Sequence, residues 1–275
     1  MKILITGSSG YIGSNLVEYL EKNVQDVEIV GLDSFPLLHL FHHPFIHSTV
    51  LDAKLPLDVI HVVHLAGKTG VKPSWNPEEI KSYYEANVLS SKRIFNTYIR
   101  PPYKTDIPIL YATSSSVDEM KSPYAMTKAT VETVAPAMAI GMKFFTVYGG
   151  KNPRPDMLYA KALSGDIDEL TENKRDFTHI NYVCEAIHAL LLYGKPDRIY
   201  DIGCGNPKTP TEFLEELDIL PTTVLNSIPI VENFDESECT QADPTEIEKI
   251  LSTKRLRELN EKINQEQEEA YQGEN

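Results

Sequence analysis

Short runs of β-branched and aliphatic residues alternate with longer amphipathic segments along the first half of the chain. This alternation is typical of a parallel α/β sheet whose strands are joined by helices. The predicted strands are Lys2–Thr6, Glu28–Leu32, Phe45–Val50, Val59–Leu65, Ile109–Thr113, Lys143–Val147 and Ile199–Ile202.

Three amphipathic segments between these strands are predicted to be helices. The first covers Tyr11–Asn23. The third begins at Pro123, which suits the first turn of a helix, and runs to about Ile140. The second carries an apolar stripe at helical spacing, formed by Ile80, Tyr84, Val88, Phe95 and Tyr98.

Two parts of the chain depart from the alternation. Only about eight residues separate the strand at Phe45–Val50 from the strand at Val59–Leu65, which is too few for a helical crossover. We therefore predict an irregular turn between them. From Pro244 onward the chain is charged and helix-prone, and we expect its last residues, Gln265–Asn275, to fray.

The composition is that of a folded globular protein. Hydrophobic residues make up 41% and charged residues 24% of the 275 positions, which excludes disordered, collagen-like and disulfide-framework proteins. The apolar runs are shorter than the ~18 residues of a membrane helix, and the first residues lack the pattern of a signal peptide. Cys184, Cys204 and Cys239 are odd in number and far apart, as free thiols are. We expect a cytoplasmic protein that does not enter a membrane.

The net charge of -14 argues against a nucleic-acid partner, because such binding needs a basic face. The charge is uneven, since eleven Asp and Glu and no Lys or Arg lie between Glu212 and Glu248. The rest of the chain is close to balance, with 26 basic and 29 acidic residues. We therefore expect an anionic ligand to bind the first two thirds of the chain and not this acidic stretch.

A glycine-rich turn, TGSSGYIG at residues 6–13, joins the first strand to the first helix. Gly7 allows a tight turn, Gly10 lets the backbone approach a pyrophosphate, and Gly13 permits close helix–strand packing. The free N–H groups of the helix N-terminus attract phosphates. Asp33 follows twenty residues after Gly13, where a carboxylate accepts hydrogen bonds from ribose, and no Lys or Arg comes directly after it. The turn predicts a dinucleotide site that prefers NAD to NADP.

A tyrosine and a lysine four residues apart, Tyr124 and Lys128, share one face of the third predicted helix. A phenol with a pKa of about 10 is a poor base at pH 7, but a nearby ammonium and a positive nicotinamide favour its ionised form. Residues 113–116, Thr-Ser-Ser-Ser, lie at the carboxyl end of the fifth strand, where open α/β sheets build their sites. These groups predict proton transfer beside a nicotinamide cofactor.

Four histidines form a local cluster at His39, His42, His43 and His47. Their spacing matches no closed zinc site, and no cysteine is near them. We interpret the cluster as part of a loop and predict no metal site.

The order of these motifs resembles the extended short-chain dehydrogenases/reductases, a family of NAD-dependent sugar epimerases and dehydratases. The glycine turn, the sequence HLAG at 64–67, the sequence YYEANV at 83–88, the serine cluster and the Tyr-Lys pair follow one another in family order. The segments at 66–74, 144–149, 154–157 and 175–180 look like the UDP-glucuronate 4-epimerase branch. The resemblance runs from about residue 2 to residue 215.

The resemblance implies a Rossmann-like, doubly wound parallel α/β sheet with a small, partly split C-terminal substrate lobe. The NAD-binding domain would comprise residues 1–148 plus about 178–203, and the lobe would comprise 149–177 and 204–275. The implied cofactor is NAD, and the implied substrate is a UDP-linked nucleotide sugar. A homodimer is also implied, because the family often pairs its helices into dimers.

Carried over position by position, the resemblance makes Tyr124 the acid/base, Lys128 its modulator, and Ser114 the catalytic hydroxyl because it stands three residues before Val117. Tyr124 and Lys128 would also contact the cofactor, together with Gly7, Gly10, Tyr11, Ile12, Gly13, Asp33, Asp52, Leu65, Ala66, Gly67, Lys68, Thr69, Asn87 and Phe145. The implied substrate contacts are Ser74, Ser115, Ser116, Thr146, Arg154 and Arg175, of which the arginines offer forked donors to phosphate.

The chain departs from the family pattern near the predicted base. Asp118-Glu119 follows Val117 in place of the usual Tyr-Gly. Only ten residues separate Ser114 from Tyr124, so a loop that usually intervenes is missing.

We predict a UDP-glucuronate/UDP-galacturonate 4-epimerase that acts through a transient 4-keto sugar. The alternatives are a nucleotide-sugar dehydratase or decarboxylase of the same family, or an inactive relative that binds nucleotide. The family's dehydratases carry Asp-Glu directly after the catalytic threonine, and its decarboxylases carry Glu two positions after it. Here those positions are Ser115 and Ser116, which favours the epimerase.

Overall fold

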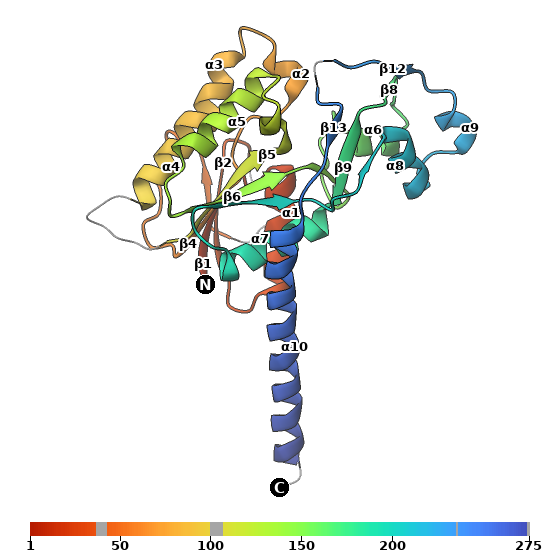
Figure 1. Ribbon diagram of the computed structural model, residues 1–275. Coiled ribbons are helices and arrows are strands. Elements are labelled where there is room, and N and C mark those ends of the chain that lie inside the picture. Colours follow the sequence, from red (N-terminus) through yellow and green to blue (C-terminus); the bar gives the residue numbers. More distant parts are fainter. Residues whose placement is uncertain (37–42, 100–106, 235, 274–275) are drawn as a thin grey trace.

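A seven-stranded parallel sheet forms the centre of the molecule in the computed structural model, which describes residues 1–36, 43–99, 107–234 and 236–273 (Figure 1). Its strand order is β10-β6-β5-β4-β1-β2-β3. This order confirms the predicted doubly wound, Rossmann-like α/β sheet. The strands are β1 (Lys2–Thr6), β2 (Glu28–Asp33), β3 (Phe45–His47), β4 (His61–His64), β5 (Ile109–Ser114), β6 (Ala139–Phe144) and β10 (Arg198–Ile202).

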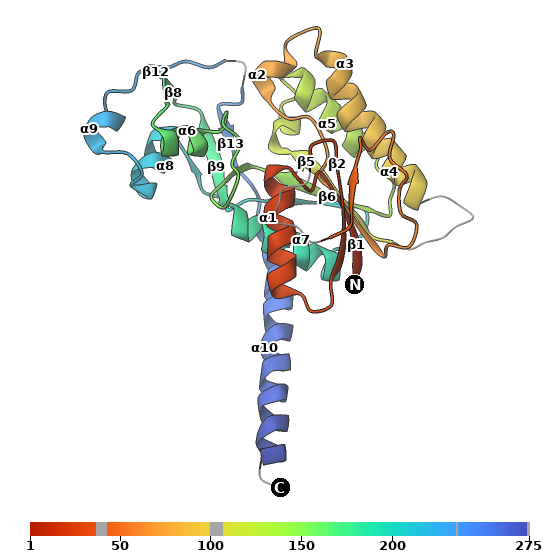
Figure 2. The ribbon, with the colours of Figure 1, turned by 180° about the vertical axis from the view of Figure 1, so that it is seen from behind.

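Helices cover both faces of this sheet (Figures 1 and 2). Helices α1 (Tyr11–Asn23) and α7 (Ile180–Tyr193) pack against one face, where Leu16 and Ile187 belong to one buried cluster. The other face carries η1 (Tyr84–Leu89, a π-helix), α4 (Ser90–Tyr98) and α5 (Pro123–Val134), which contribute Val88, Phe95 and Val131 to a second cluster. Two further short helices, α2 (Val71–Ser74) and α3 (Ile80–Tyr83), precede η1.

The strand order reverses between β1 and β4, because the chain runs outward from β1 to β3 and then returns to the other side of β1. In open α/β sheets, ligands bind outside the carboxyl ends of the strands at such a point. The glycine turn follows β1, and residues 65–70 follow β4. The topology therefore brings these two segments to the same edge.

A smaller lobe sits beside this edge (Figure 1). Its core includes Phe177 and Phe213, whose rings stack with centroids 3.7 Å apart. Its strands are β7 (Thr146–Tyr148), β8 (Leu170–Thr171), β9 (Lys174–His179), β11 (Pro207–Lys208), β12 (Ile230–Val231) and β13 (Cys239–Thr240). Its helices are α6 (Leu158–Ser164), α8 (Pro210–Leu217) and α9 (Thr222–Leu225).

The predicted third helix is too long, because α5 ends at Val134 and the chain becomes extended at Ala135. Pro136 explains this end, since the residue before a proline is pushed away from the helical region. The predicted strand at Lys143–Val147 is also wrong as a single unit. Its first residues end β6 in the main sheet, and its last residues belong to β7, which pairs with β9 in the lobe.

The apolar stripe of the second predicted helix does not lie on one buried face. The helix runs from Ile80 to Tyr98 as expected, but its middle turn is the π-helix η1. A π-turn holds more residues than an α-turn and so rotates the face of the helix. As a result Tyr83 is buried in the position predicted for Tyr84, which is 47% exposed.

The C-terminal helix α10 (Thr245–Gly273) projects well beyond the sheet (Figure 1). Its first turns pack against the main domain, since Ile247 and Leu251 are fully buried in the cluster that contains α7. The assignment of this part of residues 204–275 to the substrate lobe is therefore wrong. The helix is continuous to Gly273, although fraying was predicted from Gln265.

Three other expectations concern loops, metals and membranes. Residues 48–60 contain turns and no helix, which confirms the predicted irregular connection. His39 and His42 lie outside the described residues. Among the described residues, no group of three or more His, Cys, Asp and Glu side chains is placed to hold a metal. The described helices also include none that is both long and apolar enough to cross a membrane.

Candidate active site

The glycine turn closes tightly over the end of β1. Gly7 has a φ of +74°, and its amide donates to the carbonyl of Leu32 at 2.7 Å. A Cβ on Gly7 would lie 2.7 Å from the amide nitrogen of Ala66. A side chain would therefore separate the β1 and β4 edges, and glycine keeps both backbones close to a ligand bound there.

Asp33 lies at the end of β2 beside this turn. Its carboxylate is 7% exposed and accepts hydrogen bonds from the amides of Ser9, at 2.9 Å, and Phe35, at 3.0 Å. The hydroxyls of Ser8 and Ser9 are buried with no hydrogen-bond partner among the described residues. Unpaired donors, a helix N-terminus and a carboxylate fit the pyrophosphate and ribose of a dinucleotide.

The segment after β4 is held in place by Asn87 of η1. The Asn87 side chain accepts from the Lys68 amide at 2.8 Å and donates to the Lys68 carbonyl at 3.0 Å. It also donates to the hydroxyl of Thr127 on α5 at 2.8 Å. Asn87 is 1% exposed, so it fixes residues 65–69 from within the protein. The π-turn that disturbs the apolar stripe is the turn that carries Asn87.

Tyr124 and Ser114 meet at the carboxyl end of β5. Tyr124 is 8% exposed and lies edge-on to the Tyr83 ring, with centroids 6.2 Å apart. Burial raises the pKa of the Tyr124 phenol, although a hydrogen bond with Ser114 and the positive charge of Arg154 oppose this. The protein alone therefore keeps the phenol neutral, and a further positive charge is needed to make it a base at neutral pH.

Lys128 lies one turn after Tyr124 on α5. Its ammonium donates to the carbonyl of Ala112 on β5 at 3.0 Å, and the residue is 5% exposed. Burial lowers the pKa of Lys128 to about 8, while the nearby Glu132 partly opposes the shift. This buried cation is available to a group that binds next to the Tyr124 phenol.

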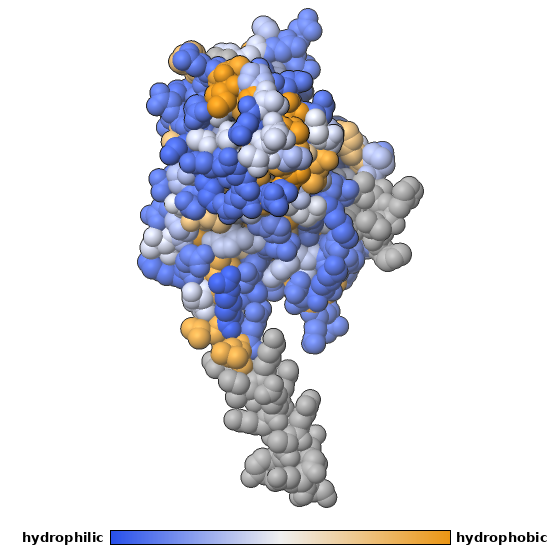
Figure 3. All heavy atoms as spheres, turned by 90° about the vertical axis from the view of Figure 1, so that its right-hand side faces the viewer, coloured by the Kyte–Doolittle hydropathy of each residue, from blue (hydrophilic) through white to orange (hydrophobic). Residues whose placement is uncertain are grey.

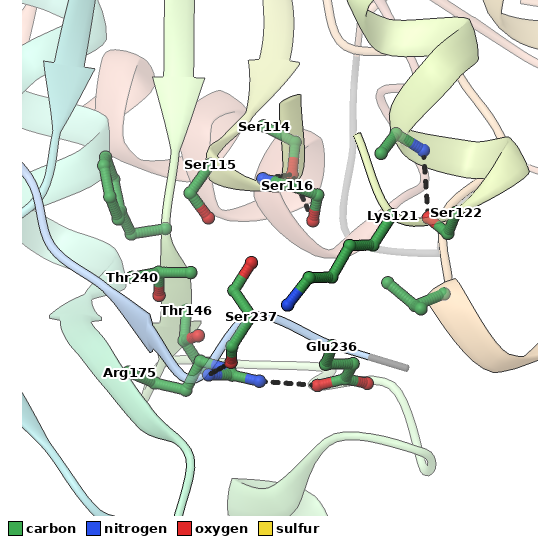
Figure 4. A pocket seen from close by; sticks show the side chains of 13 residues that line it. Ser114, Ser115, Ser116, Lys121, Ser122, Thr146, Arg175, Glu236, Ser237 and Thr240 are labelled. Atoms are coloured by element: carbon green, nitrogen blue, oxygen red, sulfur yellow. Dashed lines mark hydrogen bonds and ion pairs between the residues drawn. The ribbon is translucent and has the colours of Figure 1, made fainter. Parts of the chain in front are cut away.

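A pocket of about 200 Å³ opens beside these side chains (Figure 4). Hydroxyl groups make up much of its wall, and they come from the end of β5 and the residues that follow it, the N-cap of α5, the start of β7, and the segment that ends in β13. Six of the residues predicted to act at the site line it: Ser114, Ser115, Ser116, Phe145, Thr146 and Arg175. One of the predicted catalytic residues and four of the predicted substrate contacts therefore share one cavity, whereas Tyr124 and Lys128 are not among its lining residues.

The family is identified by a sequence profile that matches most of the chain. The profile, described as NAD dependent epimerase/dehydratase family, covers residues 3–203. The chain belongs to this family. Its cofactor is therefore NAD, consistent with the fit of the glycine turn and Asp33 to a dinucleotide.

Individual relatives of this epimerase/dehydratase are moderately similar. The protein named uncharacterized UDP-glucose epimerase YtcB of Bacillus subtilis is 30% identical, over 72% of this chain and 74% of its own. UDP-glucuronate 4-epimerase 1 of Arabidopsis thaliana is 29% identical, over 79% of this chain and 64% of its own. The structure of MoeE5 with UDP-glucuronic acid and NAD has a TM-score of 0.77 at 25% identity, over 92% of this chain and 93% of its own.

Among the predicted contacts that do not line the pocket are Ser74, Asp52 and Arg154. Ser74 is fully buried and donates to the Val71 carbonyl at 2.7 Å, so its prediction as a substrate contact is not supported. Asp52 is exposed and accepts from Thr49 at 2.6 Å. Arg154 forms a forked pair with Asp156, at 3.0 and 3.1 Å, and donates to Thr69. The roles given to Asp52 and Arg154 stay predictions.

Sequence reasoning missed part of the pocket wall, namely Lys121, Ser122, Glu236, Ser237 and Thr240. The last three belong to the acidic stretch that was expected to avoid an anionic ligand. Glu236 pairs with Arg175 at 2.7 Å, so its charge is balanced at the pocket wall. Where an anionic ligand binds stays a prediction. No sequence motif marks these positions. Ser122 alone carries a signal, since a serine before proline is a common N-cap, and it accepts from the Ala125 amide at 3.1 Å.

Proposed function

We propose that this family member is a nucleotide-sugar 4-epimerase that interconverts UDP-glucuronate and UDP-galacturonate. The observation that carries the proposal is that Tyr124 and Ser114 lie beside a pocket lined by Ser115 and Ser116, at the two positions where the family's dehydratases and decarboxylases carry acids. The similarity to UDP-glucuronate 4-epimerase 1 and to MoeE5 supports the same substrate class.

Bound NAD supplies a hydride acceptor and donor for C4 of the sugar. Tyr124 would take the proton from the O4 hydroxyl and later return it, while Ser114 hydrogen-bonds the same oxygen. Lys128 would hold a cofactor ribose beside the phenol and, with the positive nicotinamide, lower the phenol pKa. The 4-keto sugar would then turn over and accept hydride on its other face.

The distribution of carboxylates argues against a dehydratase. Removing the C6 hydroxyl requires an acid that is protonated near pH 7. Glu119, close to Ser116 in sequence, pairs with Lys121 at 2.6 Å, and this interaction lowers the pKa of its carboxyl. Glu236 lines the pocket but is ion-paired to Arg175. An ionised carboxylate cannot protonate a leaving hydroxide, so the epimerase fits these groups better.

The proposal is tested by incubating the NAD-loaded protein with UDP-glucuronate and following the sugar by NMR. We expect UDP-galacturonate, with the carboxylate retained and no net NADH. Replacing Tyr124 with Phe should lower turnover by about 10²–10⁴-fold, the usual contribution of a general base. Tyr98→Phe is the matched control, because it removes a buried phenol oxygen that donates to Pro56, away from the pocket.

Other products would overturn the proposal. A UDP-pentose would indicate a decarboxylase, and a 4-keto-6-deoxy sugar from UDP-glucose would indicate a dehydratase. Binding of UDP-sugars without turnover would indicate an inactive relative. Full activity of the Tyr124→Phe variant would remove the mechanism.

A further inference from the structure

Among the described residues, two cationic side chains line the pocket, Arg175 and Lys121, and they differ in how many hydrogen bonds and ion pairs they form within the protein. The Arg175 side chain is only 16% exposed and pairs with Glu236 at 2.7 Å. It also donates to the carbonyls of Ser237, at 2.8 Å, and Lys174, at 2.9 Å. Arg175 is thus committed to holding the segment around Ser237 against β9. Freeing it for a ligand would leave Glu236 without its cation.

Lys121 is engaged far less. Its side chain is 43% exposed and pairs with Glu119, which is 38% exposed, at 2.6 Å. An exposed ion pair of this kind contributes little to stability, so Lys121 can exchange Glu119 for another anion. Lys121 lines the pocket, and the Glu119 carboxylate beside it also hydrogen-bonds the side chain of Ser237, another lining residue, so Glu119 keeps a partner if Lys121 leaves it. Figure 4 shows the Lys121 side chain extending into the cavity toward Ser237.

The backbone around Lys121 is fixed on both sides. The 3-10 helix η2 (Ser115–Asp118) follows β5, and the Met120 amide donates to the Ser116 carbonyl at 3.2 Å. Met120, directly before Lys121, has a φ of +50°, in the left-handed region. Ser122 then caps α5. The short interval between Ser114 and Tyr124 therefore delivers a lysine to the pocket wall.

We propose that Lys121 is a specificity-determining residue that selects a sugar with a carboxylate at C6. Ser115 and Ser116 would hydrogen-bond this carboxylate, and Lys121 would exchange Glu119 for it. This inference rests on the proposed function, because it takes the sugar to lie with C6 toward these serines. It concerns recognition only, so it is tested by binding and not by the chemical step.

The test measures binding of UDP-glucuronate, UDP-glucose and UDP to NAD-loaded protein by calorimetry, in the Tyr124→Phe background so that no sugar turns over. Lys121→Gln should weaken UDP-glucuronate by about 10- to 100-fold, the loss expected for one charge-assisted hydrogen bond. UDP-glucose and UDP should change by less than about threefold, and Lys121→Arg should restore most of the preference. Lys72→Gln is the control, because Lys72 is 73% exposed and pairs with Glu169.

The outcomes separate this inference from the proposed function. Equal weakening of all three ligands would place Lys121 on the diphosphate and overturn the inference. Equally tight binding of UDP-glucose and UDP-glucuronate when Lys121 is unchanged would also overturn the inference. Epimerisation of UDP-glucose would still be consistent with a 4-epimerase. The binding of UDP-glucuronate could depend on Lys121 while the protein that retains Tyr124 decarboxylates this sugar. That result would support the inference and overturn the proposed function. Failure of every UDP-sugar to bind would overturn both.

Discussion

At the scale of single residues, Lys128 lowers the stability of the folded protein but places a positive charge beside Tyr124. Lys128 is a buried cation, 5% exposed, and its ammonium donates a hydrogen bond to the neutral carbonyl of Ala112. Its pKa of about 8 lies below the ordinary value because burial disfavours the charge. Without cofactor, the folded state therefore carries a cost that the unfolded state does not.

We predict that Lys128→Met raises the melting temperature of the cofactor-free protein at pH 7, on the order of 5 °C. The lost hydrogen bond to Ala112 offsets part of the gain. Between pH 8 and 10.5 the unfolded state holds a proton that the folded state has released, so the stability of the unmodified protein gains from rising pH. The difference in melting temperature between the two proteins should narrow over that range.

Lys143 gives the opposite control for this prediction. Burial lowers its pKa, but the hydrogen bond and charge of Asp118, at 2.6 Å, outweigh burial and raise it. Lys143→Met should therefore destabilise the protein at pH 7. A lower melting temperature for Lys128→Met as well would show that its buried charge is compensated.

At the scale of elements, His64 joins three of them at the cofactor edge. It ends β4, and its Nδ1 lies 2.7 Å from the hydroxyl of Thr6 at the end of β1. Its Nε2 lies 3.0 Å from the hydroxyl of Ser91 on α4. Burial, with a smaller contribution from Lys128, lowers the His64 pKa to about 3. The His64 imidazole is therefore neutral in these two contacts, with Thr6 and with Ser91.

We predict that His64 makes the fold sensitive to acid. Below pH 6.5 the unfolded state takes up a proton on this residue and the folded state does not, so the free energy of unfolding falls as pH drops toward 3. The loss is about 2 kcal/mol between pH 7 and pH 5. Urea denaturation of His64→Gln should show a correspondingly flatter acid dependence, from a lower stability at neutral pH.

Ser91→Ala is the informative comparison for His64. It removes one hydrogen bond of the same group but keeps the titrating ring, so it should lower stability at neutral pH and preserve the acid slope. An identical slope in His64→Gln and the unmodified protein would assign the acid sensitivity to other residues.

The elements also show where sequence reasoning succeeds and fails. Most strands and the glycine turn follow from patterns of near neighbours, and both could be predicted. The π-turn could not, because its advantage is tertiary: it places Asn87 where it bonds both Lys68 and Thr127. Lys121 was likewise missed, because its direction depends on the left-handed turn at Met120.

At the scale of the whole molecule, α10 begins in the core of the main domain and continues into solvent. Leu251, near its start, is fully buried against the main domain, whereas Leu256 is 62% exposed. Figure 3 shows hydrophobic side chains on the surface close to the grey end of this helix. The start of α10 is therefore part of the core, although its sequence resembles a solvated, charged helix.

We predict that Leu251→Ala lowers the free energy of unfolding by about 2–5 kcal/mol, the range for a buried leucine. Leu256→Ala, the same change five residues further on, should stay within about 0.5 kcal/mol of the unmodified protein. Urea denaturation of the two variants compares them directly. Equal effects would mean that α10 is packed differently from this description.

The strand order has a consequence for how the chain folds. β1 is synthesised first but lies in the middle of the sheet, where Leu4 pairs with Val30 on one side and Val62 on the other. All pairings of the seven-stranded sheet are parallel, so each requires a long connection to close before it forms. Such high contact order slows folding and leaves apolar strand edges open meanwhile. A nascent chain that stops before His64 emerges has its central strand β1 paired on one side only, with the other edge open to association with other chains.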